Sequence, residues 1–325
     1  MSLAGLQYHR PASVEEAMAR AGELDEQGLS FAWLAGGSDL VPRIKQHHDE
    51  VQALIALGGI GAMRGIGANG DNGLSIGALT PLAEIINDAL VAERAPTLAE
   101  AASRVASPQI RNQATLGGNL LVDRRCIYYN QSEINRQCHR PCFKAGGDHC
   151  PLINSVKAGD WPQCHARFVS DTVPVLLLMN TTLRLAGPKA ERSLPLAELY
   201  RPDGIDGLVM ERDEILTGIE IDPPPDSRIV YAKLAIRNTL DFPSLGVAAG
   251  FDGQSFAVAI TGVNTHPGQF SFPSSEFSTT GELLQAACEQ AHDFAETYNQ
   301  DFFNRGYRKD MIPVLLRRLA SQLGL

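Results

Sequence analysis

Ala114-Thr115-Leu116-Gly117-Gly118-Asn119 is followed within a few residues by Cys126, the first of five cysteines between positions 126 and 164. The sixth cysteine, Cys288, lies far away in the sequence. Glycines let a backbone turn approach a phosphate closely, and the Thr hydroxyl and Asn amide offer further contacts. Clustered thiols indicate a shared partner, because scattered free cysteines normally behave as small buried hydrophobic residues. The sequence therefore predicts a nucleotide-type cofactor beside a metal cluster, which is typical of electron transfer.

A second glycine turn, Ala35-Gly36-Gly37-Ser38-Asp39-Leu40, follows the apolar segment that ends at Ala35 and precedes a short helical pattern. Its backbone amides can point at a phosphate, and the dipole of the following helix favours an anion there. The alternative is an ordinary strand-to-helix turn. Two such turns in one chain suggest a diphosphate held between them.

One further glycine pattern is rejected. Gly65-Ile66-Gly67-Ala68-Asn69-Gly70 matches the dinucleotide fingerprint G-x-G-x-x-G. That fingerprint requires a strand before it and a helix beginning within it. Here Asp71-Asn72-Gly73 and a strand-like segment follow, so we expect a β-hairpin instead.

The cysteine-rich stretch contains Cys126, Cys138, Cys142, Cys150 and Cys164. A cubane iron–sulfur cluster needs four thiolates, whereas zinc accepts four ligands from Cys and His, and three histidines lie nearby. Only Cys138 and Cys142 have the short spacing of a zinc knuckle. Spacing alone leaves iron–sulfur and zinc open. The stretch is also rich in cations (Arg124, Arg125, Arg136, Arg140, Lys144), which we expect near solvent, where they could dock an acidic ferredoxin.

Composition excludes several classes of protein. The 325 residues carry a net charge of −9, which argues against a nucleic-acid surface. No apolar run is long enough to span a membrane, and the first residues do not resemble a signal peptide. We expect a cytoplasmic protein, in which thiols stay reduced and bind metal rather than form disulfides. No catalytic residue is expected, because no Ser/His/Asp order or carboxylate pair stands out.

The pattern of apolar segments divides the chain into three parts. Residues 1–58 alternate as helix, strand, turn, helix and strand, which fits a small parallel α/β unit. Residues 59–222 form a larger mixed α+β part, with the cysteine-rich insert at about 122–168. A helix is expected after Thr80-Pro81, with Thr80 as its cap and Pro81 as its first residue. Residues 223–325 follow a proline-rich boundary and are expected to form a C-terminal α+β domain with helices over 281–298 and 311–323.

Taken together, these residues resemble the FAD-binding medium subunit of the xanthine oxidase/carbon monoxide dehydrogenase family of molybdenum enzymes. The resemblance rests on both glycine turns, on the segment from Gln109 to Asn119 and on Lys233 to Pro243. It implies a two-subdomain FAD-binding fold with a C-terminal domain. It also implies FAD contacts from these residues: Ala35, Gly36, Gly37, Ser38, Asp39, Leu40, Ala106, Thr115, Gly117, Gly118, Asn119, Asp171, Lys233 and Asp241.

The cysteine-rich insert is similar to one in the β subunit of 4-hydroxybenzoyl-CoA reductase, which carries a [4Fe-4S] cluster. The similarity begins at Asp123-Arg124-Arg125-Cys126 and displaces Asp171 by roughly 40 residues. Carried over by position, the cluster ligands are Cys126, Cys142, Cys150 and Cys164. The alternative is that Cys138 replaces Cys164, which gives a more compact set.

This resemblance implies a subunit that passes electrons from a ferredoxin-type donor towards the [2Fe-2S] and molybdenum subunits of an aromatic CoA-thioester reductase. The implied assembly joins this chain to a large molybdopterin subunit and a small [2Fe-2S] subunit, as a heterotrimer that dimerises to a heterohexamer. The alternative is the FAD subunit of a xanthine dehydrogenase-like hydroxylase, which passes electrons outward to NAD or another acceptor. A third class is a free-standing flavoprotein without molybdenum partners.

Overall fold

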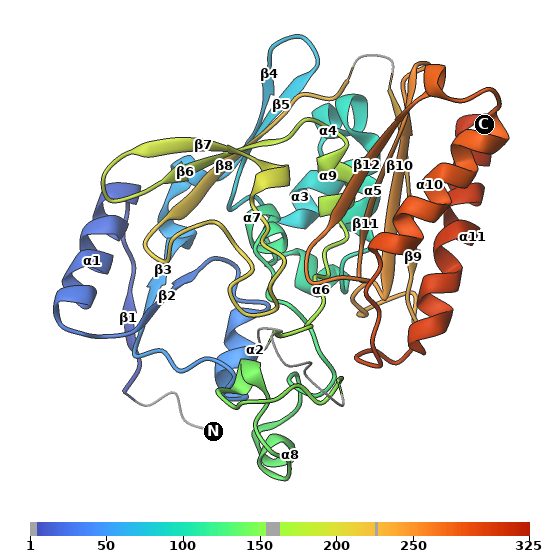
Figure 1. The fold of residues 1–325 in the computed structure, drawn as a ribbon. Helices are drawn as coiled ribbons and strands as arrows, with labels where there is room; N and C mark the ends of the chain where they lie inside the picture. Colours follow the sequence, from blue (N-terminus) through green and yellow to red (C-terminus); the bar gives the residue numbers. More distant parts are fainter. Residues whose placement is uncertain (1–4, 154–162, 225–226) are drawn as a thin grey trace.

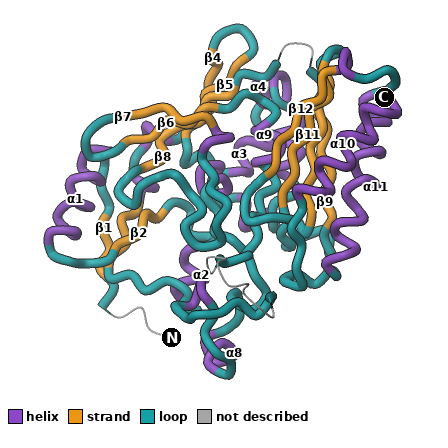
Figure 2. Tube along the Cα trace, in the orientation of Figure 1, coloured by secondary structure: helices purple, strands orange, loops and turns teal. Residues whose placement is uncertain are grey.

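The computed structural model describes residues 5–153, 163–224 and 227–325, and these residues form an α+β fold built on three separate sheets (Figure 1). The first sheet has three parallel strands, the second has five antiparallel strands and the third has four antiparallel strands. Figure 2 shows helices and long loops between the sheets. The predicted fold class is confirmed.

The first sheet lies near the N-terminus and has the strand order β1-β3-β2. Its predicted alternation of helices and strands is confirmed. Ser13 caps the first helix, because its Oγ accepts a hydrogen bond from the N–H of Glu16 at 3.2 Å. Ala17, Ala21 and Leu24 repeat at helical spacing and are buried against the sheet side of this helix. The elements are β1 (Gln7–His9), α1 (Val14–Glu26), β2 (Phe31–Leu34), α2 (Leu40–Lys45) and β3 (Ala53–Ala56).

The second sheet has the order β4-β5-β8-β6-β7. Its strands are β4 (Ile66–Asn69), β5 (Gly73–Gly77), β6 (Thr182–Ala186), β7 (Glu191–Pro195) and β8 (Ile215–Ile221). Short helices connect the strands: α3 (Leu82–Asn87), α4 (Ala89–Arg94), α5 (Pro96–Ser103), α6 (Pro108–Arg111), α7 (Leu116–Leu120) and α9 (Val173–Leu177). Three 3₁₀ turns complete this part: η1 (Leu57–Gly59), η2 (Gly61–Met63) and η4 (Leu196–Glu198).

Two local predictions in this region have different outcomes. The G-x-G-x-x-G segment forms the hairpin β4–β5, so its rejection as a dinucleotide motif is confirmed. The expectation that Thr80 caps α3 and that Pro81 is its first residue is wrong. Pro81 itself is the N-cap residue, with an extended ψ of 144°. The buried Thr80 hydroxyl instead accepts from the N–H of Gly65 at 3.0 Å and donates to its carbonyl oxygen at 3.1 Å.

The third sheet belongs to the C-terminal part and has the order β12-β11-β10-β9, with two long helices on one side (Figure 1). Its elements are β9 (Arg228–Leu234), β10 (Leu245–Phe251), β11 (Ser255–Thr261), β12 (Gly268–Pro273), η5 (Ser274–Glu276), α10 (Thr280–Phe294) and α11 (Arg305–Leu323). The helices are shifted from the predicted ranges. α10 ends at Phe294 because Ala295 is extended, and α11 begins earlier because the Asn304 side chain caps it. Its first turn is polar, so apolar periodicity could not reveal it.

Two main hydrophobic cores hold the described residues together. The larger joins α1 and the first sheet to the second sheet and its helices, and it includes Leu24, Ile55, Ile76 and Leu98. The smaller lies between the third sheet and helices α10 and α11. The predicted domain boundaries at 58/59 and 222/223 stay predictions.

The cysteine-rich insert, called the thiol insert here (residues 126–166), leaves and rejoins the fold at one point. The backbone of Arg125 pairs with that of Arg167 through N–H to carbonyl hydrogen bonds of 2.8 and 2.9 Å. The insert contains α8 (Glu133–Gln137) and η3 (Phe143–Ala145), and α8 projects from the lower side of the molecule in Figure 1. Among the residues that the structure describes, none of the helices combines the length and the apolar character needed to cross a bilayer.

Candidate functional site

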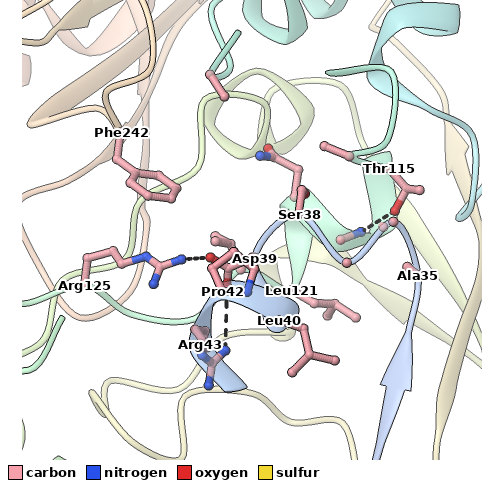
Figure 3. Close-up of a pocket in the computed structure, with 18 of the residues that line it drawn as sticks. Ala35, Ser38, Asp39, Leu40, Pro42, Arg43, Thr115, Leu121, Arg125 and Phe242 are labelled. Carbon is pink, nitrogen blue, oxygen red and sulfur yellow. Dashed lines mark hydrogen bonds and ion pairs between the residues drawn. The ribbon is translucent and has the colours of Figure 1, made fainter. Parts of the chain in front are cut away.

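A cavity of about 680 Å³ lies where the two glycine turns meet (Figure 3). Its size is within the range of small-molecule and cofactor sites. Eleven of the predicted FAD contacts line it: Ala35, Gly36, Gly37, Ser38, Asp39, Leu40, Ala106, Thr115, Gly117, Gly118 and Asn119. The structure therefore brings the two turns to one site, as two cooperating turns require.

The two turns touch each other at Gly36. A Cβ atom at this position would overlap the backbone carbonyl of Gln113, just before the second turn. Gly37 has a φ of +69°, in the left-handed region that favours glycine. Both glycines are therefore required by the backbone, one by close approach and the other by conformation.

The backbone amides of the two turns are used differently. In the second turn, the N–H of Gly117 donates to the Ala78 carbonyl at 2.9 Å, and that of Gly118 donates to the Thr115 hydroxyl at 3.1 Å. In the first turn, the N–H groups of Ser38 and Asp39 have no acceptor in the described part of the chain. Donors of this kind suit an anion, because backbone amides seldom stay unpaired when a site is filled.

Asn119 is held by its neighbours. Its Oδ1 accepts from the hydroxyls of Ser170 and Thr172, both at 2.7 Å. This fixes the side chain and leaves its amide nitrogen as the group that can donate to a ligand.

Three predicted contacts lie outside the cavity wall. The carboxylate of Asp171 is buried and accepts from the Tyr231 hydroxyl at 2.7 Å and from Lys233 Nζ at 3.0 Å. Burial raises the pKa of Asp171, although Lys233 beside it lowers that pKa in part. Asp241 accepts from the backbone and guanidinium of Arg237 within its own loop. None of the three is among the residues that line the cavity.

A cluster of charged side chains on the cavity wall was not predicted from the sequence. Asp39 forms ion pairs with Arg125 and with Arg43, whose Nη1 lies 3.7 Å from its Oδ2 (Figure 3). The Arg125 guanidinium also stacks on Phe242, 4.7 Å from the ring centroid. The sequence signal available for this cluster was the spacing of Asp39 and Arg43, which places them one helical turn apart.

Two residues of the wall have strained backbones. Ala106 has a φ of +44° and Leu240 a φ of +70°, and the N–H of Leu240 donates to the Ala106 carbonyl at 3.2 Å. Left-handed conformations of residues other than glycine often mark ligand sites. This contact holds the loop of Leu240 and Phe242 against the rest of the wall.

A second, smaller pocket adjoins the first. Its wall includes four of the five clustered cysteines, namely Cys126, Cys142, Cys150 and Cys164, together with apolar side chains. Cys126 lines both pockets. The space between the side chains is about 10 Å³, room for roughly one water molecule, so the loops must spread to admit anything larger. Cys138 does not line this pocket; it is exposed, and its thiol contacts the Ile134 carbonyl at 3.3 Å.

The pocket thiols are free and largely buried. Burial raises the pKa of Cys126 and of Cys150, and raises that of Cys164 to about 12. Nearby backbone N–H groups lower the pKa values of Cys126, Cys150 and Cys164 in part. In the part of the chain that the structure describes, no three His, Cys, Asp or Glu side chains converge as they would around a single metal ion.

Most of the cations that were predicted to face solvent have little exposure. Arg124 is buried, and the side chains of Arg125 and Lys144 are only 12% and 7% exposed. Lys144 bonds to Asp123 and to the Gly204 carbonyl. The expectation that they form an exposed docking surface is wrong, because their charges are needed for contacts within the fold. Arg140 is exposed and pairs with Asp148, while Arg136 is partly buried and bonds to backbone carbonyls.

Comparison with known families shows which cofactor this chain binds. The profile of the family described as "FAD binding domain in molybdopterin dehydrogenase" matches residues 4–224, which include both glycine turns. The chain belongs to this family. It is therefore an FAD-binding subunit of a molybdenum oxidoreductase, and the resemblance to the xanthine oxidase/carbon monoxide dehydrogenase family is confirmed.

Curated relatives of this FAD-binding family cover most of the chain. The aldehyde oxidoreductase FAD-binding subunit of Escherichia coli K12 is 27% identical over 277 residues, which are 81% of this chain and 85% of the relative. The carbon monoxide dehydrogenase medium chain of Afipia carboxidovorans is 26% identical over 325 residues, which are 97% and 95% of the two chains. The xanthine dehydrogenase FAD-binding subunit of E. coli O157:H7 is 25% identical over 74% of this chain and 67% of its own length.

Solved structures of other molybdenum enzymes have the same fold. Carbon monoxide dehydrogenase from Hydrogenophaga pseudoflava matches with a TM-score of 0.74 at 24% identity, and covers 99% of this chain and 98% of its own. Quinoline 2-oxidoreductase from Pseudomonas putida 86 matches with a TM-score of 0.73 at 18% identity, over the same shares of both chains. The fold shared with these structures therefore includes the C-terminal part as well.

The residues of the larger cavity fit FAD. The unpaired amides of Ser38 and Asp39 and the cations Arg43 and Arg125 suit the negative charge of a diphosphate. The apolar wall, including Phe242, suits a flat aromatic ring system. These residues would bind and orient the cofactor, while FAD itself supplies the redox chemistry.

Proposed function

We propose that this chain is the FAD- and [4Fe-4S]-containing electron-transfer subunit of a molybdenum-dependent aromatic CoA-thioester reductase similar to 4-hydroxybenzoyl-CoA reductase. Cys126 carries the proposal, because its side chain lines both the FAD cavity and the thiol pocket. A redox centre held by these thiols would adjoin the flavin site. Such an arrangement suits a relay between an external ferredoxin-type donor and the [2Fe-2S] and molybdenum subunits.

The donor set suits a cubane cluster. Four cysteines from separate parts of the thiol insert line one pocket, and four is the number of thiolate ligands that a cubane needs.

The pocket also favours one ligand set over the alternative. Cys164 is buried beside Cys126 in the same apolar cluster, whereas Cys138, at the C-terminal end of α8, is exposed and does not line the pocket. We therefore assign the cluster to Cys126, Cys142, Cys150 and Cys164.

The proposed assembly includes a large molybdopterin subunit and a small [2Fe-2S] subunit, as a heterotrimer that dimerises to a heterohexamer in the cytoplasm. The names of the relatives support a subunit role, since they read "FAD-binding subunit" and "medium chain". Because Arg124 is buried and the side chains of Arg125 and Lys144 are engaged in ion pairs with little exposure, the ferredoxin surface would rest on Arg140 and on other parts of the complex.

A second function is favoured by the curated relatives. Their names include a xanthine dehydrogenase, a nicotinate dehydrogenase and a nicotine 6-hydroxylase. In this alternative the chain is the FAD subunit of a hydroxylase, passing electrons outward to NAD or another acceptor. The thiol pocket would then hold zinc or nothing.

Anaerobic purification of the complex tests the proposal. We expect FAD, about four irons and four acid-labile sulfides on this chain, and an EPR signal of a reduced cubane beyond those of the [2Fe-2S] subunit. The complex should accept electrons from reduced ferredoxin and reduce an aromatic CoA thioester. Zinc without sulfide, or rapid reduction of NAD by a hydroxylation substrate, would favour the alternative.

A further inference from the structure

Arg125 lies at the junction of the FAD cavity and the thiol insert. It precedes Cys126 directly, and its backbone forms the bridge to Arg167 that closes the neck of the insert. Its side chain lines the FAD cavity and pairs with Asp39 of the first glycine turn (Figure 3). Arg125 therefore contacts the first glycine turn through its guanidinium, and its backbone fixes the position of the adjoining pocket residue, Cys126.

The surroundings shield one partner of this ion pair. The Arg125 side chain is 12% exposed and stacks on Phe242, whereas the Asp39 side chain is 33% exposed. Water screens this pair less than a fully exposed one, so its charge-assisted hydrogen bond is worth more than one at the open surface. Burial and the nearby Arg167 lower the pKa of Arg125 to about 10, so the guanidinium stays charged at neutral pH.

A second path of ion pairs leads from the same carboxylate to the same pocket. Arg43 lies 3.7 Å from Asp39 and 3.5 Å from Asp123. Lys144 pairs with Asp123 at 2.7 Å and lines the thiol pocket. Asp39 is thus the point where two connections to the thiols meet.

We propose that Arg125 is a positioning residue that couples FAD binding to the order of the thiol pocket through Asp39. FAD fixes the first glycine turn and with it Asp39, and Asp39 then holds Arg125 and the adjoining Cys126. The coupling is reciprocal, because each site stabilises the same arrangement of Asp39 and Arg125. The identity of the pocket's occupant rests on the proposed function, but the coupling can be measured on the chain without iron.

The experiment uses the full chain, prepared free of flavin and iron. FAD affinity is measured from the fluorescence change on titration. Pocket order is measured as the alkylation rate of Cys142 and Cys150, resolved by mass spectrometry, with and without FAD. Both thiols line only the small pocket, so bound FAD cannot shield them directly. The exposed Cys138 serves as an internal reference for the reagent.

In the natural chain we expect FAD to slow alkylation of Cys142 and Cys150 severalfold, because buried thiols react only when the loop opens. Arg125→Gln should weaken FAD binding about tenfold and remove most of this protection. Arg125→Lys should restore only part of both effects, since an ammonium cannot stack on Phe242 in the same way. Asp39→Asn should remove at least as much protection as Arg125→Gln, because it also breaks the path through Arg43, and adding Arg125→Gln to it should change little further.

Arg140→Gln is the matched control. It removes an arginine–aspartate pair within the thiol insert, but that pair is exposed and far from the cavity wall. We expect no change in FAD affinity or in protection. Should Arg125→Gln alter FAD affinity without altering the protection of Cys142 and Cys150, or should the effects of the two single variants add fully, the coupling would be refuted. Absence of iron from the natural complex would instead contradict the proposed function and leave this test intact.

Discussion

A single methyl group at Gly36 should separate the two glycine turns. In Gly36→Ala, the new Cβ atom would overlap the backbone carbonyl of Gln113, which a rotamer change cannot relieve. Overpacking of this kind costs about 1–3 kcal/mol, and the backbone here has little freedom because Gly37 already adopts a left-handed conformation. Relief requires the first turn to move away from the second. If the whole strain is felt only when FAD is bound, the dissociation constant for FAD rises about 5- to 150-fold, because about 1.4 kcal/mol corresponds to a factor of ten.

FAD titration of the flavin-free chain measures the affinity, and urea unfolding of the same protein measures its stability. Gly22→Ala is the control: it lies in the interior of α1, where a Cβ atom meets nothing within 4 Å. We expect that control to bind FAD normally and to gain about 0.5–1 kcal/mol of stability, since alanine favours helix. An unchanged FAD dissociation constant in Gly36→Ala would show that the two turns do not grip the cofactor together.

Three further predictions concern other side chains. The Arg192 guanidinium lowers the pKa of Glu214, which lies on the cavity wall. This pair therefore stabilises the fold above the unfolded pKa near 4.5, and the gain is lost as the pH falls below that value. Glu214→Gln should reduce the loss of unfolding free energy in acid by about 1 kcal/mol, and identical profiles of unfolding free energy against pH would contradict this. Cys138→Ser should leave the iron content of the chain unchanged, whereas the same change at any pocket cysteine should lower it; iron loss in Cys138→Ser would reverse the ligand assignment. Asp171→Asn should cost about 3 kcal/mol in unfolding free energy, because it leaves the Lys233 ammonium, whose side chain is 10% exposed, with only the Arg104 carbonyl as a partner among the described residues. The added change Lys233→Met should recover much of this cost with FAD affinity retained. A large loss of FAD affinity in the stable double variant would place Asp171 at the cofactor after all.

The glycine positions of the site could be anticipated from the sequence, because glycine allows a close approach of the backbone that other residues do not. Gly36, Gly37, Gly117 and Gly118 all line the cavity as expected. The shape of the hairpin at 65–77 was likewise visible in its turn residues. Local signals of this kind depend on a few neighbouring residues, so one sequence is enough to read them.

Side-chain partners across long distances could not be anticipated. Arg125 meets Asp39 across 86 positions and Lys233 meets Asp171 across 62, and no local pattern encodes either pairing. The cations in and just before the thiol insert look like solvent-facing charges in the sequence. Arg124 is nevertheless only 2% exposed, because backbone carbonyls of the fold accept its hydrogen bonds. Thr80 is a similar case, since its hydroxyl forms hydrogen bonds with the backbone of Gly65, 15 positions away and just before strand β4. Burial of polar groups is decided by tertiary contacts, which propensity does not describe.

The backbone bridge between Arg125 and Arg167 has a consequence for the origin of this chain. Because the two ends of the thiol insert already meet there, the whole loop could be gained or removed by joining two neighbouring backbone positions, so the strands on either side need not change their course. Only the part of the cavity wall that the insert supplies, at Cys126, Ile127 and Asn130, would have to be rebuilt.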